Sequence, residues 1–209
     1  MTEYAAIAAA ALRAELDIMG GVHEDGGTIL LLGPSARFWP ALKSGPEWQD
    51  GAPDPVDRWS LRVIGALAAD LGGEALFPFG GPPYLPFLRW ATASGRAWQS
   101  PAGMIVHDTA GLWVSYRGAL RFSHQIPLPR AGLSPCETCA DQPCMSACPV
   151  DALSAARGYD VAACHAFLDT PAGDDCLSHG CKARRACPVS QAFGRDPEQS
   201  AFHMSYFHR

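Results

Sequence analysis

Residues 136–149 have the sequence CETCADQPCMSACP, which is the most informative segment of the C-terminal region. Its four cysteines follow the spacing Cys-x2-Cys-x4-Cys-x3-Cys, and Pro149 comes directly after the last of them. A Cys-x3-Cys-Pro sequence is typical of iron–sulfur proteins. No cysteine precedes this stretch, and four more follow it, the last succeeded by Pro188: Cys164, Cys176, Cys181 and Cys187.

Eight cysteines make two complete sets of four, which is the number of thiolates that two [4Fe–4S] clusters require. In two-cluster ferredoxins the cysteine before the proline binds the opposite cluster. By that logic we predict one cluster on Cys136, Cys139, Cys144 and Cys187. The second cluster is then predicted on Cys148, Cys164, Cys176 and Cys181.

Other uses of the cysteines fit the spacing less well. Two structural zinc sites are the main alternative, but such sites favour paired Cys-x2-Cys knuckles and the chain has only one. One cluster with four ordinary thiols leaves the second Cys-Pro pair unexplained. A disulfide scaffold needs an oxidising compartment, and no export signal is present. His165 and His179 lie beside cysteines, and we expect them to be hydrogen-bonded or solvent-facing.

The composition narrows the possible partners. The chain has 209 residues, of which 48% are hydrophobic and 18% are charged, so it has enough apolar residues to form a core. Its net charge of -5, with only two lysines and no basic run, predicts no nucleic-acid binding. No apolar run reaches the length of a membrane span, and the first residues lack a basic signal region. We therefore expect a cytoplasmic protein with no membrane contact.

The chain is predicted to have two domains, residues 1–130 and residues 131–209, joined by a proline-rich linker over 126–135. Alternating helical and strand patterns in the first predict an α/β or α+β layered domain. Asp54 is the predicted N-cap of a helix that ends at Gly72. The other predicted elements are a helix over 4–19 ended by Gly20 and Gly21, strands over 28–32 and 74–79, helices over 35–42 and 83–97, paired strands over 104–107 and 112–116, and a helix over 150–157.

Two resemblances extend this interpretation. The motif at 136–149, the isolated Cys164 and the final Cys187-Pro188 together resemble the ferredoxin module of epoxyqueuosine reductase, a cobalamin and iron–sulfur enzyme. GPSARFWPAL at 33–42, DPVDRW at 54–59, GMIVH at 103–107 and GLWVSYRG at 111–118 occur in this order. That series resembles the cytosolic cobalamin-processing enzymes. The resemblance implies an α+β protein in which a small nitroreductase-like domain precedes a two-cluster ferredoxin-like module.

The resemblance also implies a corrinoid site, with candidate residues in the first domain. Phe79 and Tyr84 lie in an apolar segment suited to a flat ring, with a plain turn as the alternative. Trp113 and Tyr116 are candidate walls of the site, or one face of a core strand. Arg117 matches a family arginine that would bind an anionic group, or it forms a surface ion pair. His107 is a candidate cofactor contact, or a hydrogen-bonded loop histidine.

The expected function is therefore an iron–sulfur electron-transfer protein with a redox partner protein. The preferred hypothesis is a cobalamin-linked reductase that passes electrons through two clusters to a corrinoid held by residues 1–130. The alternative is a ferredoxin-like carrier whose first domain is a docking module without its own cofactor. No catalytic residue is assigned from the sequence.

Overall fold

The computed structural model describes residues 2–209 and divides into two compact units. Unit 1 comprises the chain up to Arg96 together with Ser115–Gly132, and unit 2 comprises Ala97–Val114 together with Leu133–Arg209. The predicted boundary near residue 130 differs from this division. Residues 97–114 belong with the cysteine-containing region, so unit 1 is built from two separate segments of the chain.

Unit 1 is built on a four-stranded antiparallel sheet. Its strand order is β1 (Leu16–Glu24), β2 (Gly27–Pro34), β6 (Gly118–Phe122) and β3 (Glu74–Leu76). Strand β2 is buried along its whole length, so both faces of the sheet are covered at its centre. Its run of Ile29 and three leucines is the continuous apolar pattern of a strand with two covered faces.

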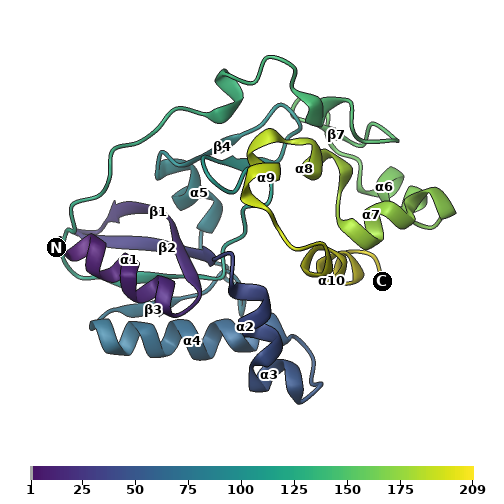
Figure 1. The fold of residues 1–209 in the computed structure, drawn as a ribbon. Helices are drawn as coiled ribbons and strands as arrows, with labels where there is room; N and C mark the ends of the chain where they lie inside the picture. Colours follow the sequence, from purple (N-terminus) through teal and green to yellow (C-terminus); the bar gives the residue numbers. More distant parts are fainter. Residues whose placement is uncertain (1) are drawn as a thin grey trace. The chain divides into compact units, whose positions relative to one another are not determined.

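Three helices of unit 1 contact this sheet, and α2 and α3 pack against α4 (Figure 1). Helices α1 and α5 contact β1, and α4 contacts β3 and β6. The predicted helix 55–71 is confirmed, and Gly72 ends it in the left-handed conformation. Asp54 precedes that helix but also has a left-handed backbone, and its side chain forms no capping bond. The helices are α1 (Glu3–Arg13), α2 (Phe38–Ser44), α3 (Pro46–Gln49), α4 (Pro55–Leu71) and α5 (Phe87–Ala93).

The predicted helix over 4–19 is wrong in its second half. Helix α1 ends at Arg13, and β1 begins at Leu16. Gly20 lies inside this strand beside a register shift and does not terminate a helix. A Cβ at Gly20 would come within 2.7 Å of Ser94 Oγ, so glycine permits a close approach there. Gly20 therefore allows the Ser94 side chain to lie close to the strand backbone and does not mark the end of a helix.

The predicted pair of strands over 104–107 and 112–116 is also wrong. Strand β5 (Ile105–His107) pairs with β4 (Ala97–Gln99), and Gly111 forms only an isolated bridge with His107. The sheet strand in this part of the chain is β6, which the sequence analysis did not predict. It has only five residues, four of them buried, and it lies between β2 and β3.

Unit 2 combines the β4–β5 hairpin with short helical segments and a small hairpin of β7 (Leu153–Ser154) and β8 (Gly158–Tyr159). The predicted helix over 150–157 is wrong, because this stretch forms a turn and strand β7. Helix α9 begins at Pro188, directly after the last cysteine. The helical segments are η1 (Pro135–Glu137), η2 (Pro143–Met145), α6 (Val161–Leu168), η3 (Pro171–Gly173), α7 (Asp174–His179), α8 (Lys182–Ala186), α9 (Pro188–Phe193) and α10 (Pro197–Phe207).

The aromatic C-terminal tail forms helix α10, which packs beside α7 in the same unit (Figure 1). Its Phe207 ring stacks on Tyr159 at 6.2 Å between centroids. Helices and antiparallel strands together make the chain an α+β protein, as predicted. No helix described between residues 2 and 209 is both long and apolar enough to cross a bilayer.

Candidate functional site

The first four cysteines lie on short turns that local sequence determines. Cys136 is on η1, where the Ser134 hydroxyl accepts a hydrogen bond from the Cys136 backbone at 3.3 Å and Glu137 completes the capping box. Pro143 opens η2, which carries Cys144. Prolines at the first position pre-set the backbone for such turns. None of the eight cysteines forms a disulfide.

Four cysteines line one cavity of about 210 Å³ within unit 2. These are Cys136, Cys139, Cys144 and Cys187, the set that the sequence analysis assigned to the first cluster. Three come from the first motif, and Cys187 comes from the end of α8, far along the chain. The structure therefore brings this predicted set around a common space.

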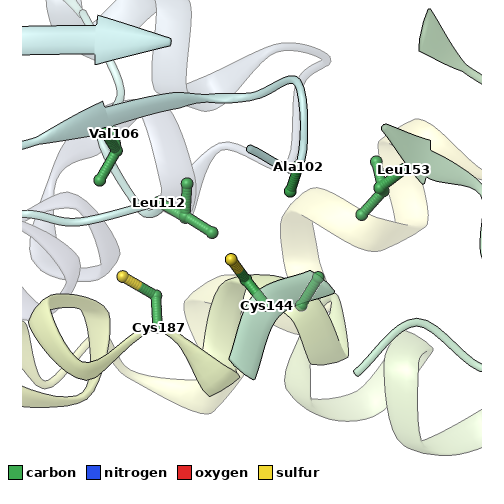
Figure 2. Packing of buried hydrophobic residues seen from close by; sticks show 7 residues of the cluster. Ala102, Val106, Leu112, Cys144, Leu153 and Cys187 are labelled. Carbon is green, nitrogen blue, oxygen red and sulfur yellow. The ribbon is translucent and has the colours of Figure 1, made fainter. Parts of the chain in front are cut away.

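The cavity borders an apolar cluster that includes residues from outside the cysteine motifs. Figure 2 shows that the sulfur atoms of Cys144 and Cys187 point towards the part of this cluster that contains Val106 and Leu112. Burial raises the pKa of the Cys144 thiol, and neighbouring Cys187 raises it further. The pKa of Cys136 is raised in the same way, with a partly opposing hydrogen bond from Ser134. Both thiols therefore hold their protons more tightly than a solvent-exposed cysteine.

Residues 97–114 are fastened to the cysteine module by backbone contacts of Leu112. The Leu112 amide donates to Ser190 Oγ at 2.8 Å, and the Leu112 carbonyl accepts from Arg184 Nη1 at 2.6 Å. Gly111 has a φ of +57°, and an added Cβ would collide with the Ser190 backbone nitrogen. The segment therefore forms a fixed wall of the cavity.

The second predicted set, Cys148, Cys164, Cys176 and Cys181, also gathers within unit 2. The pKa of Cys164 is raised by burial and, through charge, by each of the other three thiols. Hydrogen-bond donors face these sulfurs: the Ala152 amide donates to Cys148 Sγ at 3.3 Å, and the Tyr159 hydroxyl donates to Cys164. Burial and the bond to Cys164 raise the pKa of Tyr159, so its hydroxyl keeps its proton.

Arg184 lies on α8, which in the sequence separates Cys181 of the second set from Cys187 of the first. The ion pairs of this helix join Lys182 and Arg185 to Asp175, and within the described residues none involves Arg184. Burial lowers the pKa of Arg184, and the Cys181 thiol partly offsets this effect. A cation shielded from water is favourable only with an anion nearby. Cysteines that ligate a metal cluster as thiolates would supply such anions.

The cysteines do not converge in the way a single ion requires. In residues 2–209 no three histidine, cysteine, aspartate or glutamate side chains are placed to hold one metal ion. His165 and His179 are hydrogen-bonded, as expected: His165 Nδ1 lies 2.7 Å from His208 Nδ1, and His179 lies 3.1 Å from an Asp175 oxygen.

Four of the six corrinoid candidates lie in unit 1. The Phe79 ring packs against Phe77, whereas Tyr84 is 68% exposed. Arg117 is paired with Asp57 at 3.6 Å, and its backbone amide donates to Leu32. Burial lowers the pKa of Arg117 and raises that of Asp57. Tyr116, the fourth, precedes β6 in the same segment.

The other two candidates lie in unit 2. His107 is fully buried, and its Nδ1 accepts hydrogen bonds from the Thr109 and Ala110 amides. Trp113 is also buried, with the Arg195 guanidinium 5.1 Å from its ring centroid. The structure thus does not gather the six residues within one unit.

Several residues at the cavity were missed by the sequence analysis. Ser100 and Leu112 line the cavity from residues 97–114, here called the β4–β5 segment, and Ser190 holds that segment in place. Nothing in the local sequence of Ser100 signals this position.

Comparisons with protein-family models, with curated proteins and with solved structures found no match to this chain.

Proposed function

We propose that unit 2 binds two [4Fe–4S] clusters and that the protein transfers electrons. The observation that carries this proposal is the cavity lined by Cys136, Cys139, Cys144 and Cys187. Three of these thiols were expected together from their spacing, but Cys187 joins them only through the crossed assignment of two-cluster ferredoxins. Such clusters take up and release single electrons.

The size of the cavity supports a multi-atom cluster over a zinc ion. A zinc ion holds its thiolates about 2.3 Å away, so four sulfurs converge closely around one point. A cavity needs only about 10–15 Å³ to hold one water molecule. The space of about 210 Å³ between these thiols accommodates a group of several atoms.

The surroundings of the thiols also fit iron–sulfur ligation. Hydrogen bonds to the sulfurs and burial set the potential of a cluster. Cys148 accepts a hydrogen bond from the Ala152 backbone amide, and the Tyr159 side-chain hydroxyl faces Cys164. Arg184 supplies positive charge beside Cys181, which would compensate part of the negative charge of four thiolates.

For the electron acceptor we propose a corrinoid held by unit 1, following the resemblance to nitroreductase-like cobalamin-processing enzymes. An antiparallel sheet flanked by helices and the exposed Tyr84 support this. The alternative, an electron carrier with a docking domain, is supported by the split of the six candidate residues between two units. The expected partner in either case is a redox protein.

The cluster proposal is tested by anaerobic reconstitution with iron and sulfide. The expected result is about eight iron and eight sulfide per chain, with EPR signals after dithionite reduction. Cys144→Ala and Cys176→Ala should each remove one cluster and leave the other. Zinc retained in place of iron, with no EPR signal, would contradict the proposal.

The acceptor proposal is tested separately by titrating cluster-loaded protein with cob(II)alamin under anaerobic conditions. A saturable base-off EPR signal supports a corrinoid site, and Tyr84→Ala should weaken the binding. Leu133→Ala, at an exposed side chain in unit 2, serves as the control. No binding to protein with both clusters intact would favour the carrier.

A further inference from the structure

Ser100 occupies a fixed position directly after strand β4. Its amide donates to the Met104 carbonyl at 2.8 Å, and its carbonyl accepts from the Gly103 amide at 2.9 Å. The residue is only 2% exposed. Both backbone groups are therefore satisfied within the turn of the β4–β5 hairpin, and only the hydroxyl is left to account for.

The Ser100 hydroxyl has no hydrogen-bond partner within the described part of the chain, although its oxygen is fully buried. Buried hydroxyl groups nearly always have a partner, because leaving one unpaired is costly. Ser100 lines the same cavity as the four cysteines. Another hydroxyl of this lining, that of Thr138, already donates to the Pro135 carbonyl.

We infer that the Ser100 hydroxyl donates a hydrogen bond to a sulfur of the group held by Cys136, Cys139, Cys144 and Cys187. This inference rests on the proposed function, since the acceptor is a sulfide or a ligand thiolate of the first cluster. Ser100 is therefore a residue that sets the potential of this cluster without being a ligand.

The direction of the effect follows from charge. Reduction adds one electron to the cluster, and no proton needs to move. A hydrogen-bond donor stabilises the more negative reduced form more strongly than the oxidised form. The Ser100 hydroxyl should therefore raise the midpoint potential of the first cluster.

The test is an EPR-monitored redox titration of the reconstituted full chain with dithionite. Ser100→Ala should lower the midpoint of the signal that is lost in Cys144→Ala, and leave the other signal unchanged. We expect up to a tenfold fall in the ratio of reduced to oxidised cluster at fixed potential, which is 59 mV for one electron. If Ser100→Ala fails to fold, Ser100→Cys carries a weaker donor and should shift the midpoint the same way.

Ser60→Ala is the matched control, because Ser60 is equally buried but lies in unit 1 and donates to the Val56 carbonyl. It should leave both midpoints unchanged. Two normal clusters with no shift in Ser100→Ala, or the same shift in Ser60→Ala, would overturn the inference alone. Wild-type protein that takes up no reducible cluster would overturn the proposed function and this inference with it.

Discussion

At the scale of single residues, Arg184 best connects the sequence to the proposed chemistry. It stands between Cys181 and Cys187 in the chain, and its guanidinium donates to the Leu112 carbonyl. Its neighbours Lys182 and Arg185 pair with Asp175, whereas Arg184 lies near Cys181, a candidate cluster ligand. A positive charge in this position favours a more negative cluster.

Arg184→Gln should therefore lower the midpoint potential of the second cluster. A loss of roughly 1–2 kcal/mol of charge stabilisation corresponds to a shift of about 60 mV for one electron. The measurement is an EPR redox titration of the signal that Cys176→Ala removes. Arg157→Gln is the control, because Arg157 is exposed and paired with Asp151. An unchanged midpoint in Arg184→Gln would contradict the assigned role.

At the scale of elements, the β4–β5 segment is the part of the site that lies outside the cysteine motifs. It reaches the cavity because Leu112 is bonded at its amide by Ser190 and at its carbonyl by Arg184. Ser190 is 1% exposed and lies on α9, which begins directly after Cys187. The helix that follows a candidate ligand thus also positions the wall of the cavity.

Ser190→Ala should destabilise unit 2, because the buried Leu112 amide would lose its acceptor. The expected loss is about 1–3 kcal/mol in the free energy of unfolding. Urea unfolding of the reconstituted protein measures it. Ser205→Ala, at an exposed hydroxyl on α10, should change stability by less than about 0.5 kcal/mol. Equal stability of the two variants would mean that the Ser190 bond does not hold the segment.

Gly111→Ala should be more disruptive than Ser190→Ala. Its backbone is left-handed, and an added Cβ meets the Ser190 nitrogen, which is main chain and has little freedom to move. We expect a lower yield of cluster-loaded protein, measured as iron per chain. Gly158→Ala is also left-handed but has open space around it, so it isolates the backbone strain. Similar iron contents in both variants would exclude a role for the contact with Ser190.

Some of these elements could be predicted from local sequence and others could not. Helix α4 was predictable because its apolar spacing is long and Pro55 and Gly72 mark its ends. The predicted helix over 4–19 extended wrongly into β1 because glycine commonly ends helices. At Gly20 the glycine instead allows the close approach of Ser94. Strand β6 was missed because its five residues acquire their strand character from pairing with β2 and β3.

The candidate site shows the same contrast. The lining of one cavity by Cys187 together with Cys136, Cys139 and Cys144 was predictable from the crossed cysteine assignment of two-cluster ferredoxins. The position of Ser100 depends on how residues 97–114 fold against the module. No spacing in the sequence encodes that contact, so it required the structure.

At the scale of the whole molecule, two units alternate along the chain. Unit 1 has a continuous sheet with a buried central strand, whereas unit 2 consists mainly of short helices and turns around thiols. A unit with few long elements gains more of its stability from a bound group. The stability of unit 2 should therefore depend on the proposed clusters, and that of unit 1 should not.

Cluster removal by anaerobic chelation should expose unit 2 selectively to hydrogen exchange. We expect the amides of residues 97–114 to lose protection together with those of 133–209. The amides of β2 and β6 should remain protected, and they serve as the internal control. If residues 97–114 instead kept the protection of the sheet, their assignment to unit 2 would be wrong.

The sharing of one cluster by Cys187 and the cysteines of the first motif is the arrangement on which the proposed function depends. It is tested most directly by the EPR spectrum of reduced, reconstituted Cys187→Ala, compared with those of Cys144→Ala and Cys176→Ala. We predict that Cys187→Ala loses the signal lost in Cys144→Ala and keeps the signal lost in Cys176→Ala. Loss of the Cys176-dependent signal instead would contradict the crossed arrangement and the interpretation of the cavity.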